Sequence, residues 1–116
     1  MNPDRTFLHH LNDIADSILK VKSFIQDITY EQFLKDDKTQ FAVIRALEII
    51  GEATRQIPEE VKKQYSNLPW QEIIKMRDKL IHHYYGVDLE VVWNTVNQDL
   101  DDLENIIQEI VLKHNQ

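Results

Sequence analysis

The sequence contains no cysteine, only two glycines and three prolines, and no apolar run that approaches the length of a bilayer-spanning helix. The absence of cysteine excludes both disulfides and zinc sites with cysteine ligands. Because glycine and proline interrupt helices most strongly, their scarcity favours long helices. A spanning helix needs about 20 apolar residues, so we expect no membrane segment. The polar start at Met1–Arg5 predicts no signal peptide and a cytoplasmic protein.

The 116 residues, of which 42% are hydrophobic, predict one globular domain that spans residues 1–116. The net charge of −7 argues against nucleic-acid binding over a broad basic surface, and it equally suits a protein that docks on a basic partner. Lys75, Arg77 and Lys79 form a small basic cluster beside two histidines, so we expect any RNA contact to be local.

Apolar residues recur at three- and four-residue spacing, which is the pattern of one face of a helix. We expect long helices from Pro3 to about Ile25, from Thr39 to Gln56, from Trp70 to Tyr84, and from Asp88, as N-cap, to beyond Ile110. Thr29–Gln32 resembles a capping box, and residues 59–65 form a short helical turn. The predicted fold is an all-α, up-and-down antiparallel bundle of four to five helices. Its expected apolar faces comprise Leu8, Leu11, Ala15, Ile18, Val21 and Ile25; Phe41, Val43, Ile44, Leu47, Ile50 and Ala53; and Leu89, Val92, Val96, Leu100, Leu103, Ile107 and Ile110.

Polar chemistry is concentrated at the end of the third long helix. Asp78 and His82 are four residues apart and share a helix face, where the carboxylate favours the charged form of the imidazole. The last turn of a helix also favours a protonated histidine, so His82 is a candidate general acid or base. Arg77 is a candidate clamp for a phosphate. A two-fold symmetric dimer would place a second such set opposite the first.

Each of these features also has a structural interpretation. An arginine followed five residues later by a histidine is common by chance, and Asp78 with His82 could be a surface pair. Tyr84 and Tyr85 could close the core. Residues that we expect to be solvated are His9, His10, His114 and the acidic run 99–104. Metal ligation by Asp78, His82 and His83 is disfavoured because the His-x3-His spacing is missing, so we expect no metal.

The stretch from Trp70 to Trp93, WQEIIKMRDKLIHHYYGVDLEVVW, resembles the signature of HepT-like proteins of the HEPN superfamily. Residues 44–53 (IRALEIIGEA) and 57–60 (IPEE) match the second-helix pattern of the same family and its continuation. The resemblance covers nearly the whole chain, which makes it far more specific than an isolated spacing of arginine and histidine.

The resemblance implies a toxin of a type VII toxin–antitoxin pair: a homodimeric, metal-independent endoribonuclease whose two motifs line one cleft. The family motif Arg-x4-His-x-Tyr falls on Arg77, His82 and Tyr84. It implies that the antitoxin, a minimal nucleotidyltransferase of the MntA type, transfers AMP from ATP onto Tyr84. No other cofactor is implied. We assign Asp78 to orienting His82.

Three further residues, Lys75, Lys79 and His83, are candidates for supporting contacts to RNA phosphates. A second class of function is a non-catalytic HEPN bundle that dimerises or binds nucleotide as an adaptor for the transferase. The acidic net charge favours the adaptor, and the intact Arg-Asp-His-Tyr set favours the enzyme. A purely structural bundle would leave the cluster around Arg77 unexplained.

Overall fold

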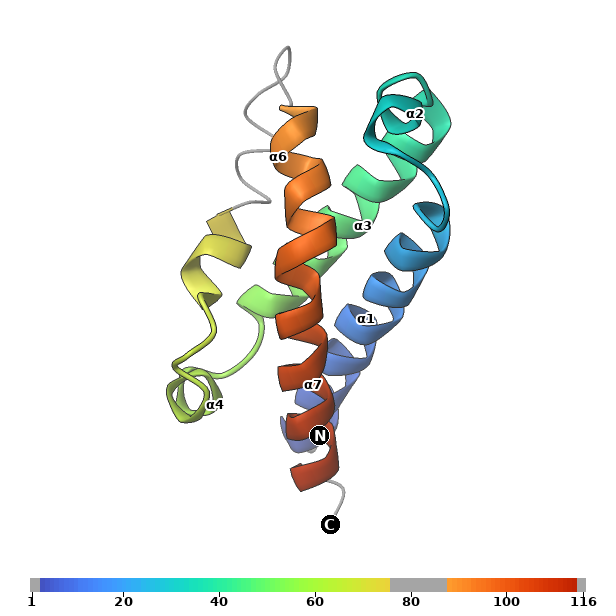
Figure 1. Ribbon diagram of the computed structural model, residues 1–116. Coiled ribbons are helices and arrows are strands. Elements are labelled where there is room, and N and C mark those ends of the chain that lie inside the picture. The colour runs from blue at the N-terminus through green and yellow to red at the C-terminus, as the bar shows by residue number, and fades with distance from the viewer. Residues whose placement is uncertain (1–2, 76–87, 115–116) are drawn as a thin grey trace.

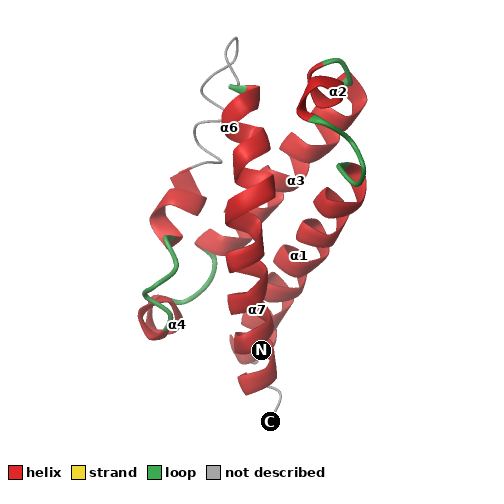
Figure 2. Ribbon diagram, viewed as in Figure 1, coloured by secondary structure: helices red, strands yellow, loops and turns green. Residues whose placement is uncertain are grey.

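The computed structural model describes residues 3–75 and 88–114, and their regular structure is helical, with no strand in either range (Figure 2). This confirms the all-α prediction. None of the helices in these two ranges is long and apolar enough to cross a membrane. The elements are α1 (Pro3–Phe24), α2 (Tyr30–Leu34), α3 (Asp37–Arg55), α4 (Glu59–Gln64), the helical residues 70–75, α6 (Leu89–Asn94), η1 (Thr95–Asp99) and α7 (Leu100–His114).

The helices alternate in direction, as the sequence predicts for an up-and-down bundle. In Figure 1, α1 rises from the N-terminus, α3 returns beside it, residues 70–75 rise again on the opposite flank, and α6, η1 and α7 descend to the C-terminus. The most extensive helix contact joins α1 to α3, and α1 also packs against α7. The short α2 packs against the start of α3 and closes one end of the bundle.

The core contains most of the apolar positions that the three- and four-residue spacing predicts, although Ile44 is only half-buried and is not among the core residues. Gly51 is also buried, on the helix that packs most closely against α1. One prediction is wrong: Phe41 was placed on the buried face, and it is 77% exposed. Phe41 precedes Val43 by two residues, which is more than half a helical turn, so the two side chains lie on opposite faces. Fully buried positions include Leu11, Ile14, Ile18, Val21, Phe33, Val43, Leu47, Ile50, Leu103, Ile107 and Ile110.

Two helix starts illustrate how local hydrogen bonds set the boundaries. The predicted capping box is present, because Gln32 N donates to Thr29 Oγ1 (3.1 Å) and Thr29 N donates to Gln32 Oε1 (2.8 Å). The next helix begins at Asp37, two residues before the predicted Thr39. Asp36 is the N-cap, and its carboxylate accepts from Thr39 N (3.1 Å). Hydrogen bonds from the Thr39 side chain and backbone lower the pKa of Asp36.

The last long helix runs without a gap from Leu89 to His114, as predicted, but it is not α-helical throughout. Residues 95–99 form the π-helical segment η1 between α6 and α7. Two side chains in this region bond to backbone carbonyls four residues earlier: Thr95 Oγ1 donates to Val91 O (2.8 Å) and Asn97 Nδ2 donates to Trp93 O (2.8 Å). Such bonds compete with the helical pattern, and π-helical turns often occur at functional sites.

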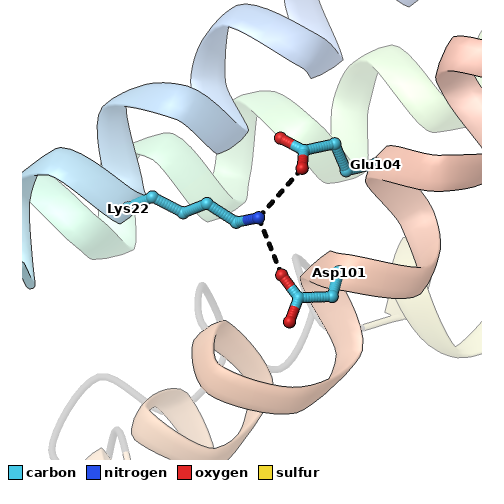
Figure 3. A network of polar contacts seen from close by, with 3 residues as sticks. All are labelled: Lys22, Asp101 and Glu104. Atoms are coloured by element: carbon cyan, nitrogen blue, oxygen red, sulfur yellow. Dashed lines mark hydrogen bonds and ion pairs between the residues drawn. The ribbon is translucent and has the colours of Figure 1, made fainter.

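The acidic run 99–104 is only partly the solvated face that its composition predicts. Lys22 Nζ from α1 contacts Asp101 Oδ1 at 2.7 Å and Glu104 Oε1 at 2.9 Å (Figure 3). The hydrogen bonds with Asp101 and then Glu104 raise the pKa of Lys22. Two of the four acids therefore join α7 to α1, whereas Asp99 and Asp102 lie on another face of the helix.

Candidate functional site

The predicted catalytic residues lie between two described helical segments. Arg77, Asp78, Lys79, His82, His83 and Tyr84 all fall within residues 76–87, outside the described ranges, so their roles stay predictions. Lys75 is described, and it is exposed at the end of the helical residues 70–75. An exposed lysine two residues before Arg77 is accessible for the predicted phosphate contact.

Both flanks of this segment are anchored by specific contacts. On one side, Trp70 is only 6% exposed and its Nε1 donates to Tyr65 O at 3.0 Å, which fixes the start of the helical residues 70–75 to the loop before it. On the other side, Asp88 Oδ1 accepts from Glu90 N (3.0 Å) and Val91 N (3.3 Å). This confirms the prediction that Asp88 caps the following helix.

A hollow of about 410 Å³ lies between these two flanks. Its buried lining comes from both sides of the bundle and is mainly apolar: Leu68 and Ile73 lie on one side, and Leu100 and Leu103 on the other, with Thr95 as the buried polar residue. Ligand pockets in proteins typically measure about 300–1,000 Å³ and combine apolar walls with a few polar groups. Exposed residues around the hollow are Pro69, Glu72, Lys75, Val91, Asp99 and Asp102.

The carboxylates at this hollow interact with one another. Burial raises the pKa of Asp99, and the negative charges of Glu72 and then Asp102 raise it further. The sequence did not predict this group of three carboxylates, because residues 99–104 have the composition of a single solvated face. The available signal was the three-residue spacing of Asp99 and Asp102, which places them on one face, away from Asp101 and Glu104.

We expect Asp99→Asn to stabilise the protein at neutral pH. The pKa of Asp99 is higher in the folded state than its ordinary value, so its negative charge destabilises the fold above the folded pKa. This destabilisation is absent below the pKa of an aspartate in the unfolded chain, which is about 3.9. Since Asp99 is exposed, the expected gain in unfolding free energy is only a few tenths of a kcal/mol, up to about 1 kcal/mol.

Urea denaturation at pH 7 and near pH 4 measures this gain, with Glu109→Gln, an exposed acid on α7 away from the hollow, as the charge-matched control. The gain at Asp99 should shrink as the pH falls, and the control should show little gain. A variant that is less stable than the wild type at pH 7 would contradict the argument.

A second hollow, of about 430 Å³, lies between α1 and α3 and includes His10, Asp13, Arg45 and Glu48. Arg45 Nη1 is 3.4 Å from Glu48 Oε2, so its charge is already paired. His9 is 73% exposed, as predicted for a solvated histidine, and its ring lies 3.7 Å from Asp13. Over residues 3–75 and 88–114, no group of three histidine, aspartate or glutamate side chains is placed to hold a metal ion.

Comparison with known proteins shows that this all-α bundle is related to a family of ribonucleases. The family described as "Ribonuclease HepT-like" matches residues 14–110, which is most of the chain. The chain belongs to the ribonuclease HepT-like family, as its resemblance to HepT-like sequences predicts.

Two relatives illustrate the similarity. "Probable ribonuclease HepT" of Thermococcus cleftensis is 48% identical over 106 residues, which cover 91% of this chain and 96% of the relative. "Putative RNase MJ0127" of Methanocaldococcus jannaschii is 44% identical over 110 residues, which cover 91% and 88% of the two chains. No solved structure matches the chain.

Proposed function

We propose that this chain is a metal-independent endoribonuclease and the toxin of a type VII toxin–antitoxin pair. The observation that carries the proposal is the intact Arg-x4-His-x-Tyr motif on Arg77, His82 and Tyr84, in a chain that matches a ribonuclease family over residues 14–110. The names of the relatives, which describe ribonucleases, support the same reaction class.

The motif supplies the groups that RNA cleavage without a metal requires. The ribose 2′-oxygen attacks the adjacent phosphorus, the bond from phosphorus to the 5′-oxygen breaks, and the products are a 2′,3′-cyclic phosphate and a 5′-hydroxyl. A base must take the 2′-hydroxyl proton and an acid must protonate the leaving 5′-oxygen. His82 is the proposed acid or base, Asp78 orients it, and Arg77 stabilises the charge that develops on the phosphorane.

A homodimer completes the proposed site. One motif offers one imidazole for two proton transfers, whereas a symmetric pair of chains brings two histidines and two arginines to one cleft. Lys75, Lys79 and His83 would contact the phosphates on either side of the scissile bond. Lys75 is exposed and therefore available for this contact. Such local contacts suit a chain whose net charge is −7.

Incubation of the purified protein with RNA in EDTA tests the proposal directly, with His82→Ala purified identically. Cleavage by the wild type alone is the expected result. Equal cleavage by both proteins would identify a contaminating nuclease. No cleavage by either would favour the second candidate function, a dimerising or nucleotide-binding adaptor of a nucleotidyltransferase, which the acidic net charge also suits.

The proposed antitoxin is a minimal nucleotidyltransferase that modifies Tyr84. The tyrosine oxygen attacks the α-phosphorus of ATP, pyrophosphate leaves, and the phenolic proton passes to a base of the transferase or to water. The attached AMP adds a negative charge and bulk close in sequence to Arg77. It would therefore compete with RNA for the guanidinium.

We expect Tyr84→Phe to escape silencing by the transferase. With ATP and the purified partner, the wild type should gain the mass of AMP and lose ribonuclease activity, whereas Tyr84→Phe should keep both its mass and its activity. Tyr85→Phe is the matched control and should be modified like the wild type. A Tyr84→Phe protein that still gains AMP and loses activity would assign the modification to another residue.

A further inference from the structure

The outer face of α3 presents an exposed aromatic ring in line with charged side chains. Phe41, Arg45, Glu48 and Glu52 follow one another at spacings of four, three and four residues, so they form one stripe along the helix. Phe41 is 77% exposed, the highest value for a large apolar side chain in residues 3–75 and 88–114. Aromatic residues are enriched in protein interfaces, so this stripe is a candidate contact surface.

The stripe is complementary to itself when it is turned end for end. Arg45 and Glu48 lie at equal distances on either side of the midpoint of the stripe, and so do Phe41 and Glu52. If two α3 helices pack antiparallel about a two-fold axis at that midpoint, Arg45 of each chain lies level with Glu48 of the other. Because the two-fold axis repeats each contact, opposite charges meet twice.

The four charges of such a pair would form one alternating network. Within a chain, Arg45 Nη1 is 3.4 Å from Glu48 Oε2, and the Arg45 side chain is 71% exposed. An exposed ion pair of this kind contributes little by itself, whereas a network of several charges contributes more. Since a guanidinium has five N–H donors, Arg45 can contact a second carboxylate without leaving the first. Each arginine would therefore lie between its own Glu48 and that of the other chain.

The same pairing gives the exposed Phe41 ring a place to bind. The ring lies level with residue 52 of the other chain, where Glu48, Ile49 and Glu52 line the hollow of about 430 Å³ between α1 and α3. Ile49 is half-buried, so part of its side chain remains available for contact. An aromatic ring that enters this hollow is removed from water, and the two-fold axis places one ring in each of the two hollows.

We propose that α3 forms a two-fold, antiparallel contact with α3 of a second copy of this chain. The contact is independent of the proposed ribonuclease function, and it includes neither Lys75 nor Asp88, which flank the motif segment. Together with the proposed motif dimer, it would give each chain two isologous contacts and build an assembly larger than a dimer. We expect one charged helix face to bury less than the usual interface of about 1,200–2,000 Å². The contact therefore forms in concentrated protein and leaves the unfolding of dilute protein unchanged.

Charge reversal followed by mixing tests the proposal. Arg45→Glu places glutamates opposite one another at both contacts, and Glu48→Arg does the same with arginines. Each variant alone should therefore self-associate at least about 100-fold more weakly than the wild type. In an equimolar mixture, a chain that has only glutamates at these two positions faces a chain that has only arginines. Both contacts then join opposite charges again, so the larger assembly should return. Sedimentation velocity over a range of protein concentrations measures each sample.

Two further variants separate the ring from the charges. Phe41→Ala should weaken the association on the order of tenfold. Leu112→Ala, which truncates a 66% exposed side chain on α7, should leave it unchanged. Circular dichroism checks that each variant is folded, and return of the assembly on mixing would itself show that both charge variants fold.

Three results would overturn the α3 contact: a wild type that forms nothing larger than the motif dimer at any concentration, single charge variants that associate as the wild type does, or a mixture of the two that stays dissociated. Binding of this face to a nucleotidyltransferase, with no association between copies of the chain, would assign the stripe to that partner instead.

Discussion

His82→Ala is expected to lower the rate of RNA cleavage by about 10²–10⁴-fold, the usual contribution of a positioned acid or base. Removal of the imidazole leaves neither a group to accept the 2′-hydroxyl proton nor one to protonate the 5′-oxygen. In a homodimer each chain carries the same substitution, so no intact histidine remains in the cleft. The single-turnover rate on a defined RNA in EDTA measures the effect.

His83→Ala is the matched control, because it removes the same side chain one position along the chain. His83 is assigned only a supporting phosphate contact, so its loss should weaken RNA binding and change the cleavage rate by less than about tenfold. Comparable losses at the two positions would mean that a histidine pair, and not the motif histidine alone, performs the proton transfers. A fully active His82→Ala protein would remove His82 from the mechanism.

Phe33→Ala is expected to cost about 3–5 kcal/mol of unfolding free energy, which is a large part of the stability of a domain of this size. Phe33 lies on the short α2, is fully buried, and contacts α6. Its ring centroid lies 5.1 Å from that of Trp93 on α6. The cavity left by the ring could not be filled without moving α2, which packs on α3.

Phe41→Ala removes the same ring from an exposed site, where it is 77% accessible, and should change the unfolding free energy by less than about 0.5 kcal/mol. Urea denaturation of the two variants side by side isolates the contribution of burial. If both variants lose similar stability, Phe41 is covered by another surface in solution, and if neither does, α2 does not contribute to the cooperative fold.

Much of the fold follows from local sequence signals. The spacing of Leu11, Ile18 and Val21 identifies a buried face because each residue returns to the same side of a helix. Thr29 and Asp88 identify helix starts because their side chains bond to nearby backbone amides. The apolar spacing alone predicts a start of α3 near Thr39, whereas the helix begins at Asp37 because Asp36, three residues before Thr39, is the N-cap.

Features that depend on tertiary packing were not predicted. The heptad-like spacing of apolar residues continues through Thr95–Asp99, so it gave no sign of the π-helical turn, which inserts a residue without ending the helix. The pairing of Lys22 with Asp101 and Glu104 joins helices from opposite ends of the sequence. The hollow of about 410 Å³ likewise forms only when Glu72 and Asp99 are brought to the same side of the bundle.

The candidate catalytic residues, by contrast, rest on the sequence motif and on family membership. Arg77, His82 and Tyr84 lie outside the described residues, so the structure contributes the two anchored flanks, the exposed Lys75 and the neighbouring hollow. Family membership supports the reaction class. Substitution of Arg77, His82 and Tyr84 one at a time therefore tests the role of each residue directly.

Analysis of the RNA ends produced in EDTA tests the central claim most directly. Metal-independent attack by the 2′-hydroxyl leaves a 2′,3′-cyclic phosphate on one fragment and a 5′-hydroxyl on the other. We expect both ends from the wild type and neither from His82→Ala. Fragments with 3′-hydroxyl and 5′-phosphate ends, or cleavage that requires an added divalent metal, would contradict the proposed mechanism.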